Sequence, residues 1–139
     1  MGFDLHVCRF RHRQEATVSW ELATGIFMRG WLHSCDWING DIEYEDSHGE
    51  VYMDRQQNGE TTGFMLTHFA GRTILERLFE YLDVTGSLLV FSCFETENWL
   101  AVTDQDLIDH LPDDFRLAEY PPVVIRDVDH MIAVLRGRD

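Results

Sequence analysis

The stretch 41-DIEYEDSHGEVYMDRQQNGE-60 contains two segments in which apolar and charged residues alternate. In the first segment, Ile42 and Tyr44 alternate with acidic residues. In the second, Val51 and Met53 alternate with Glu50, Tyr52 and Asp54. A period of two is typical of β-strands that bury one face and expose the other. Each segment is therefore predicted to be a strand.

Turn residues connect these strands to one another and to a third. We expect the first turn at 46–49 and the second at Asn58-Gly59, a pair that favours the positive φ required at both residues of a tight hairpin. The chain would then return as a strand over 61–67. The sequence predicts a three-stranded antiparallel meander over about 41–67, with one apolar and one solvent-facing side.

The segment after the meander has helical periodicity. Residues 71–83 place apolar side chains on one face of a helix, namely Ile74, Leu75, Leu78, Phe79 and Leu82. The apolar run over 87–94 is typical of a central strand. Residues 103–112 are predicted to form a short helix capped by Thr103, with Asp106 three residues later.

The two ends of the chain supply further elements. Alternation over 2–8 predicts a half-buried strand, and the basic cluster at 9–14 is interpreted as a turn or the start of the next element. Residues 18–33 fit both a helix and a strand, and we choose a helix. VVIRD predicts a last short strand, and a helix capped by Asp127 closes the chain.

This order of elements predicts an α+β fold. The 139 residues are expected to form a single domain, with a mostly antiparallel sheet and helices packed on one of its faces.

Charge limits the classes of partner. The formal net charge is −14, and all eleven basic residues are arginine. Such charge repels phosphates and anionic lipids but speeds encounters with basic molecules, so we expect neither a nucleic acid nor a membrane as a direct ligand. Asp4 interrupts the apolar run that a signal peptide would need, which favours the cytoplasm. The three cysteines fit no disulfide framework and are interpreted as reduced thiols.

Most candidate catalytic and metal-binding residues have simpler structural explanations, and the pair Glu95/Glu97 stays open. Four acidic pairs have the spacing that could ligate Mg²⁺ or Ca²⁺, namely Glu43/Glu45, Glu95/Glu97, Asp104/Asp106 and Asp127/Asp129. The last two fall in first helical turns, where carboxylates offset the helix dipole. His33, Cys35 and Asp36 suggest zinc or an activated thiol, but no second ligand pair has usable spacing. No nucleotide-binding motif is present, so no cofactor is expected.

The segment FETENWLAVTD, residues 94–104, is interpreted as a connection at the edge of the sheet. Trp99 more often packs on the core in such a position, but tryptophan beside Glu95 and Glu97 is also the composition of an interaction hot spot. The predicted partner-binding residues are therefore Glu43, Glu45, Asp46, Glu50, Tyr52, Asp54, Glu95, Glu97 and Trp99.

In DIEYEDSHGE, in FETENW and in its lack of catalytic motifs, the chain resembles bacterial toxin-immunity proteins in general type. The resemblance implies tight one-to-one binding of a cognate basic toxin, such as a nuclease, by a monomer or weak homodimer that is not an enzyme. Three alternatives stay open. They are a phosphate-mimicking inhibitor of another nucleic-acid-handling enzyme, a small enzyme using His33, Cys35 and Asp36 or a metal pair, and an acidic subunit of a larger assembly.

Overall fold

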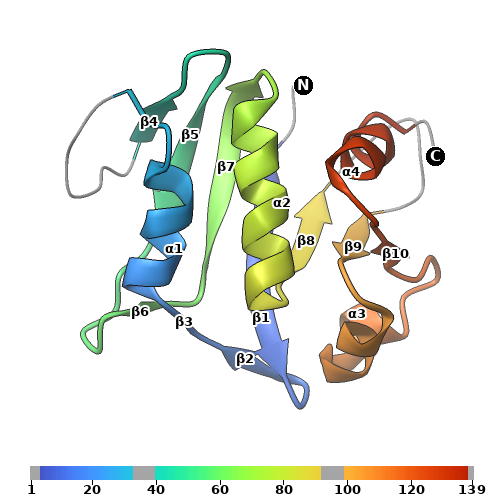
Figure 1. The fold of residues 1–139 in the computed structure, drawn as a ribbon. Helices are drawn as coiled ribbons and strands as arrows, with labels where there is room; N and C mark the ends of the chain where they lie inside the picture. Colours follow the sequence, from blue (N-terminus) through green and yellow to red (C-terminus); the bar gives the residue numbers. More distant parts are fainter. Residues whose placement is uncertain (1–3, 33–39, 92–98, 138–139) are drawn as a thin grey trace.

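Eight strands form one mostly antiparallel sheet within residues 4–32, 40–91 and 99–137, which the computed structural model describes (Figure 1). The order across the sheet is β10 (Val123–Val124), β9 (Leu100–Val102), β8 (Leu88–Phe91), β1 (Leu5–Arg11), β7 (Gly63–Ala70), β5 (His48–Met53) and β4 (Gly40–Glu43), with β2 (Gln14–Ala16) paired to the end of β1. Only β10 and β9 pair in parallel among these strands. The predicted α+β class is confirmed.

The predicted meander is confirmed as β4, β5 and β7, which are antiparallel neighbours. The four alternating apolar residues are buried, with exposed fractions of 3% or less, namely Ile42, Tyr44, Val51 and Met53. The sequence prediction of one apolar face therefore identified the correct side of these strands.

The second connection of the meander differs from the predicted tight hairpin. Only Gly59 has a positive φ, of 77°, and the Asn58 side chain instead accepts a hydrogen bond from the Glu60 backbone at 3.1 Å. The chain then enters β6 (Glu60–Thr61), which pairs with β3 (Val18–Ser19) in a separate two-stranded sheet. This contact between segments far apart in sequence lengthens the connection, and β7 begins only at Gly63.

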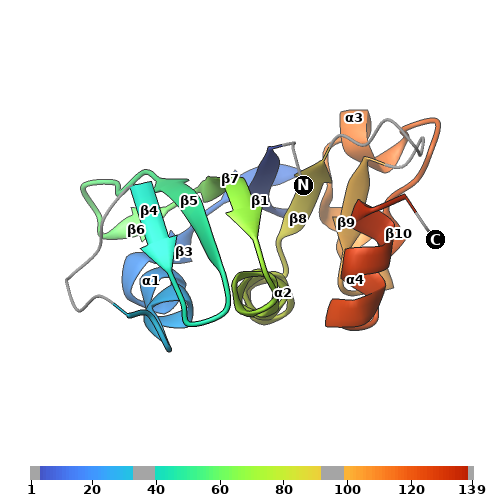
Figure 2. The same ribbon diagram turned by 90° about the horizontal axis from the view of Figure 1, so that it is seen from above.

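Three helices cover one face of the sheet, α1 (Trp20–Met28), α2 (Thr73–Thr85) and α4 (Val128–Leu135), as Figure 2 shows. The helix chosen for 18–33 is observed over Trp20–Met28, and α2 lies two residues further along the chain than predicted. Gly86, with φ of 66°, ends α2 in the left-handed conformation that glycine adopts readily. No described helix has the length and apolar character needed to cross a membrane.

A second apolar cluster lies on the opposite face of the sheet, at the β8–β9–β10 end. Here the 3₁₀ helix η1 (Gln105–His110) and α3 (Asp113–Arg116) pack over a buried set consisting of Leu88, Leu100, Val102 and Leu111. The sheet thus has helices on both faces at this end, in addition to the expected layer on the first face (Figure 2).

The start of η1 corrects the predicted cap. The side chain of Asp104, not Thr103, accepts the backbone hydrogen bond of Asp106 at 2.9 Å. The preceding segment also differs from the predicted loop, because residues 100–102 form strand β9. All three residues of β9 are buried, so the sequence shows no alternation there.

The basic cluster at 9–14 is divided between two elements. Strand β1 continues through Arg11, and the chain turns at His12 and Arg13, which both have positive φ, of 51° and 68°. The His12 backbone donates to Nδ1 of His110 at 3.1 Å, and the Arg13 backbone donates to the His110 carbonyl at 2.8 Å. The turn is therefore held against the end of η1.

Candidate functional site

The side of the meander that faces away from α1 and α2 is not covered by η1 and α3, which pack at the other end of the sheet. Along each strand, every second side chain is buried against the helices and the next points to this opposite side. We call this surface the open face. Its described residues are Asp4, His6, Asp41, Glu43, His48, Glu50, Tyr52, Met65 and Thr67 together with His68.

The strand registers bring these residues into rows. His6 pairs with Met65, and Met65 pairs in turn with Tyr52, so the three lie side by side across β1, β7 and β5. Asp41 pairs with Glu50, and Glu43 pairs with His48, across β4 and β5. Directly opposed side chains are about 5 Å apart. The open face therefore carries adjacent carboxylates beside a Tyr and a Met.

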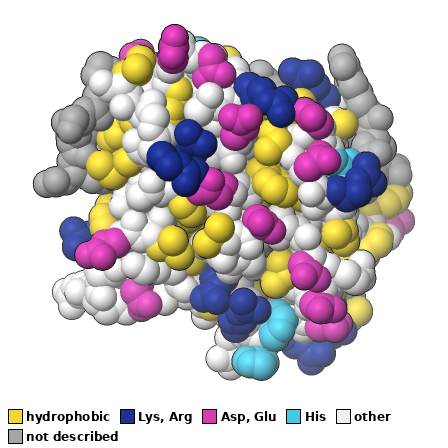
Figure 3. Space-filling model, in the orientation of Figure 1, with side chains coloured by type: hydrophobic (Ala, Val, Ile, Leu, Met, Phe, Trp, Pro, Cys, Tyr) yellow, Lys and Arg dark blue, Asp and Glu magenta, His cyan; other side chains and the backbone are white. Residues whose placement is uncertain are grey.

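The open face contains no arginine among its described residues, although ten of the eleven arginines lie within the described part of the chain. Arg9, on β1, points to the helix side, where its Nε donates to the Thr85 carbonyl at 2.8 Å. On the helix-covered face, arginines alternate with acids, as Figure 3 shows. There Arg29 pairs with Glu80, and Arg72 pairs with Glu76 and Asp129.

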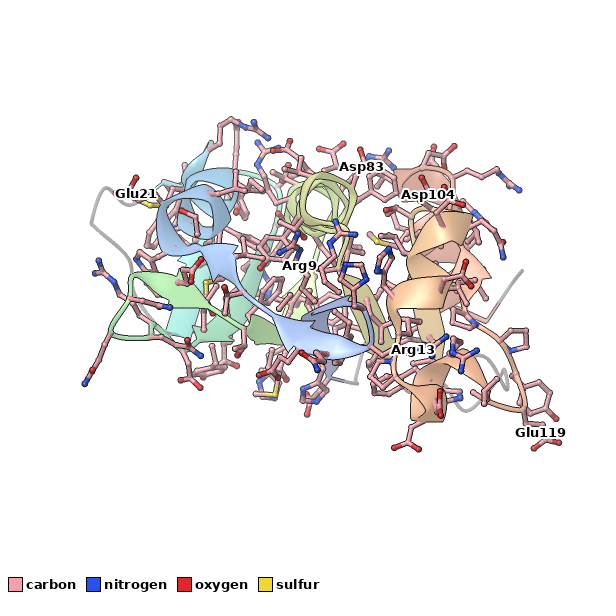
Figure 4. The ribbon with its side chains drawn as sticks, turned by 90° about the horizontal axis from the view of Figure 1, so that it is seen from below. Arg9, Arg13, Glu21, Asp83, Asp104 and Glu119 are labelled. Carbon is pink, nitrogen blue, oxygen red and sulfur yellow. The ribbon has the colours of Figure 1, made fainter. Side chains whose placement is uncertain are left out.

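Carboxylates themselves are not confined to the open face. In Figure 4, Glu21 and Glu119 lie at opposite sides of the view, and Asp83 and Asp104 lie near each other between them. Residues 104–119, which we call the aspartate-rich segment, carry six acids, although Asp104 caps η1 and Asp113 pairs with Arg116 at 2.6 Å. Acids thus occur on several surfaces, and what distinguishes the open face is that no arginine lies beside its carboxylates in the part of the chain that the structure describes.

Glu50 lies in the centre of the open face and has two hydrogen-bond partners. The Tyr52 hydroxyl donates to Glu50 Oε1 at 2.8 Å, and Nδ1 of His68 contacts Oε2. The hydrogen bond from Tyr52 and then that from His68 hold the pKa of Glu50 below its usual range. Glu50 therefore remains ionised under ordinary conditions.

A β-bulge brings His68 to Glu50. The register between β5 and β7 shifts between His48 and Glu50, so that His68 and Phe69 face the single residue Gly49. His68 has φ of 49°, while Phe69 is buried with an exposed fraction of 2%. The bulge allows Phe69 to remain in the core while His68 reaches the carboxylate.

A shallow groove of about 330 Å³ crosses the open face at this point. Its charged or titratable lining consists of Asp41, Glu43, His48, Glu50 and His68. Within the described parts of the chain, no three His, Cys, Asp or Glu side chains are arranged to hold a metal ion. Three carboxylates and two imidazoles thus line the groove, a chemistry that attracts cationic groups.

The structure brings together some of the predicted partner-binding residues. Glu43, Glu50 and Tyr52 share the open face, and Asp54 directly follows β5. Glu45 lies in the turn between β4 and β5.

Asp46 lies in the same turn but at the start of α2. Hydrogen bonds from the Thr73 side chain, followed by those from Ser47 and the backbone, hold the pKa of Asp46 below its usual range. Asp46 thus contributes to the beginning of a helix.

Trp99 lies at the other end of the sheet from the meander. It is partly buried in the second apolar cluster, with its ring centroid 5.8 Å from that of Phe115. Three strands, β8, β1 and β7, lie between β9 and β5, so about 19 Å separates Trp99's end of the sheet from Tyr52. Glu95 and Glu97 lie outside the described residues, as do His33, Cys35 and Asp36.

Sequence reasoning did not include several residues of the open face. Asp4 and His6 lie on the polar side of the alternating segment FDLHV, but their position beside the meander depends on the pairing of β1 with β7. Thr67 donates to Asp4 Oδ1 at 2.5 Å, which links the two strands. Asp41 and His48 fit the alternation of their own strands, which is the signal that could have identified them.

Two other features are weaker candidates. A groove of about 620 Å³ lies between α2 and α4, but Arg72 on its rim is neutralised by Asp129 and Glu76. Burial, followed by the nearby Glu15, raises the pKa of the Cys8 thiol to about 11, so Cys8 is a poor nucleophile.

No protein-family model matches the chain, and comparisons with curated proteins and with solved structures gave no match.

Proposed function

We propose that the protein is an immunity-type inhibitor that binds one molecule of a basic protein toxin through the open face. The observation that carries this proposal is a surface on which Asp4, Asp41, Glu43 and Glu50 lie to one side of Tyr52 and Met65, with no arginine among its described residues. The proposal involves no catalysis and no cofactor, and it places the protein in the cytoplasm as a monomer or weak homodimer.

Complementary charge supports a cationic partner. Clustered carboxylates attract basic molecules over long range, raise the rate of encounter and disfavour acidic partners. The arginines on the helix-covered face have acidic neighbours that reduce this attraction there. Each carboxylate of the open face should therefore attract a cationic partner more strongly than a carboxylate on the helix-covered face does.

The spacing of the carboxylates supports a target that binds phosphates. Asp41 and Glu43 are two residues apart on one strand, a separation of about 7 Å, and Glu50 lies opposite Asp41 about 5 Å away. An array of negative charges at such intervals presents to a nuclease a pattern similar to that of a nucleic-acid backbone. A toxin with nuclease activity is accordingly the target that we propose.

Tyr52 and Met65 supply the apolar part of the surface. Tyr52 has an exposed fraction of 40%, and its hydroxyl is oriented by Glu50. Tyrosine is enriched at binding hot spots because it buries a large area while losing little side-chain freedom. Charge would thus guide the partner, and these side chains would hold it.

The test compares two variants that each remove three acids. Asp41→Asn/Glu43→Gln/Glu50→Gln changes the open face, whereas Asp109→Asn/Asp114→Asn/Glu119→Gln changes the aspartate-rich segment by the same charge. The wild-type protein and both variants are used to capture partners from a lysate of the source organism. The partner's nuclease activity is then titrated with each protein.

We expect the wild-type protein and the aspartate-rich-segment variant to bind and inhibit the same basic protein. The open-face variant should bind it at least about 10-fold more weakly, because close charge pairs across such interfaces contribute substantially. Equal inhibition by the open-face variant would contradict the proposal. A captured target that handles nucleic acid but is no toxin would favour the phosphate-mimicking alternative.

A further inference from the structure

We propose that the open face releases its cationic partner as the pH falls from about 8 to about 5.5, because three histidines lie among its carboxylates. This inference concerns regulation and rests on the proposed function. Its basis is the position of His6, His48 and His68 on a surface without arginine.

Each histidine is placed by its strand. His48 pairs with Glu43 across β4 and β5, and His68 contacts Glu50 through the bulge. His6 lies on β1 between Met65 of β7 and Val90 of β8. The side chains of His6, His48 and His68 are exposed, so both solvent and a bound partner can reach them.

The charged groups that face each imidazole come from the described strands packed beside it. Around His48 and His68 they are Asp41 and Glu43 on β4 and Glu50 on β5. Around His6, the neighbouring residues of β7 and β8 are uncharged, and its own strand contributes Asp4 and Cys8. No arginine faces any of the three within the described residues, so histidine is the source of positive charge on this surface.

Protonation changes the charge of the open face greatly. Its four carboxylates, Asp4, Asp41, Glu43 and Glu50, give a charge of −4 when the imidazoles are neutral and −1 when all three are protonated. Imidazole is the side chain whose charge ordinarily changes between pH 5 and 8. A face that attracts cations when these imidazoles are neutral therefore loses most of its attraction when they are protonated.

Linkage requires that the partner and the protons compete. A bound cation disfavours a protonated imidazole beside it, so binding releases protons at intermediate pH. The affinity must then fall as the proton concentration rises. The direction of this change in affinity follows from the sign of the charges. For an anionic partner, the affinity would rise instead.

The experiment measures the dissociation constant at about pH 8 and about pH 5.5, at fixed ionic strength. The quantity compared between proteins is the dissociation constant at the lower pH divided by that at the higher pH. Three proteins are used: the wild type, His6→Gln/His48→Gln/His68→Asn, and His12→Asn as the control. Asparagine replaces His68 and His12 because it tolerates the positive φ at both positions. The ligands are the captured basic protein and an oligo-arginine peptide.

We expect the ratio to be about 10 or more for the wild type and the His12 variant, because three like charges are added to the surface. It should approach 1 for the triple-histidine variant. Titration calorimetry in two buffers of different ionisation enthalpy should show proton release by the wild type that the triple variant lacks.

The outcomes separate the two proposals. If Asp41→Asn/Glu43→Gln/Glu50→Gln binds as tightly as the wild type at the higher pH, the proposed function fails and this inference fails with it. If binding depends on those carboxylates but is equal at both pH values, only this inference is overturned. It is likewise overturned if the triple-histidine variant keeps the wild-type ratio.

Discussion

Gly49 is the residue on which the bulge of the open face depends. A Cβ at this position would lie 2.5 Å from Cδ1 of Ile74 and 3.1 Å from both Cδ1 of Leu66 and Cβ of Phe69. The two methyl groups can move, but Phe69 Cβ is fixed to the backbone of β7. We predict that Gly49→Ala destabilises the protein by about 1–3 kcal/mol through overpacking, measured by urea denaturation.

Gly25 provides the matched control, because the same glycine-to-alanine change can be made there. It lies inside α1, and a Cβ there would have no neighbouring atom within 4 Å. Gly25→Ala should stabilise the protein by about 0.5–1 kcal/mol, because alanine favours the helix. Similar stabilities for the two variants would contradict the packing described around Gly49.

At the scale of elements, the turn between β4 and β5 anchors the beginning of α2. Ser47 is buried, and its Oγ accepts the backbone hydrogen bond of Ile74 at 3.0 Å. Ser47→Ala leaves this N–H without a partner, and we predict a loss of about 1–2 kcal/mol in the free energy of unfolding. The measurement is again chemical denaturation.

Ser19 caps α1 in a different environment and serves as the comparison. Its Oγ lies 3.5 Å from the Leu22 nitrogen, and the contact is exposed to solvent. Ser19→Ala should therefore change stability by about 0.5 kcal/mol or less, at the low end for a cap. An equal effect of both substitutions would show that burial does not distinguish the two caps.

Several elements that the sequence predicted have a strong periodic pattern, whereas β8 was predicted from a continuous apolar run. Strands β4 and β5 and helix α2 each bury one side, so a period of 2 or 3.6 residues is visible in their sequences. Strand β9 buries all three of its residues and shows no period. The pairing of β6 with β3 joins segments about 40 residues apart, which no local pattern encodes.

The candidate site was predictable only within single strands. Alternation placed Glu43, Glu50 and Tyr52 on the polar side of the meander, where the structure shows them. The order of the strands was not predictable, and it separates Trp99 from these residues and adds Asp4 and His6. The bulge at His68 was also missed, because it depends on packing between Gly49 and α2.

At the scale of the whole molecule, arginine is distributed less evenly than the acids. Acidic residues occur on both faces, but the described arginines lie on the helix-covered face, at the turns or at the α3 end. The net charge of −14 therefore acts most strongly where no arginine offsets it. We therefore expect a cationic ligand to prefer the open face to the aspartate-rich segment.

The most direct measurement is the map of backbone amide chemical-shift changes when an oligo-arginine peptide is added to the ¹⁵N-labelled protein at low ionic strength. We expect the largest changes in β4, β5 and β7, and we expect them to decrease as the Debye length shrinks from about 30 Å at 0.01 M salt to about 8 Å at 0.15 M. Changes centred on residues 104–119, or spread evenly over the protein, would contradict this expectation.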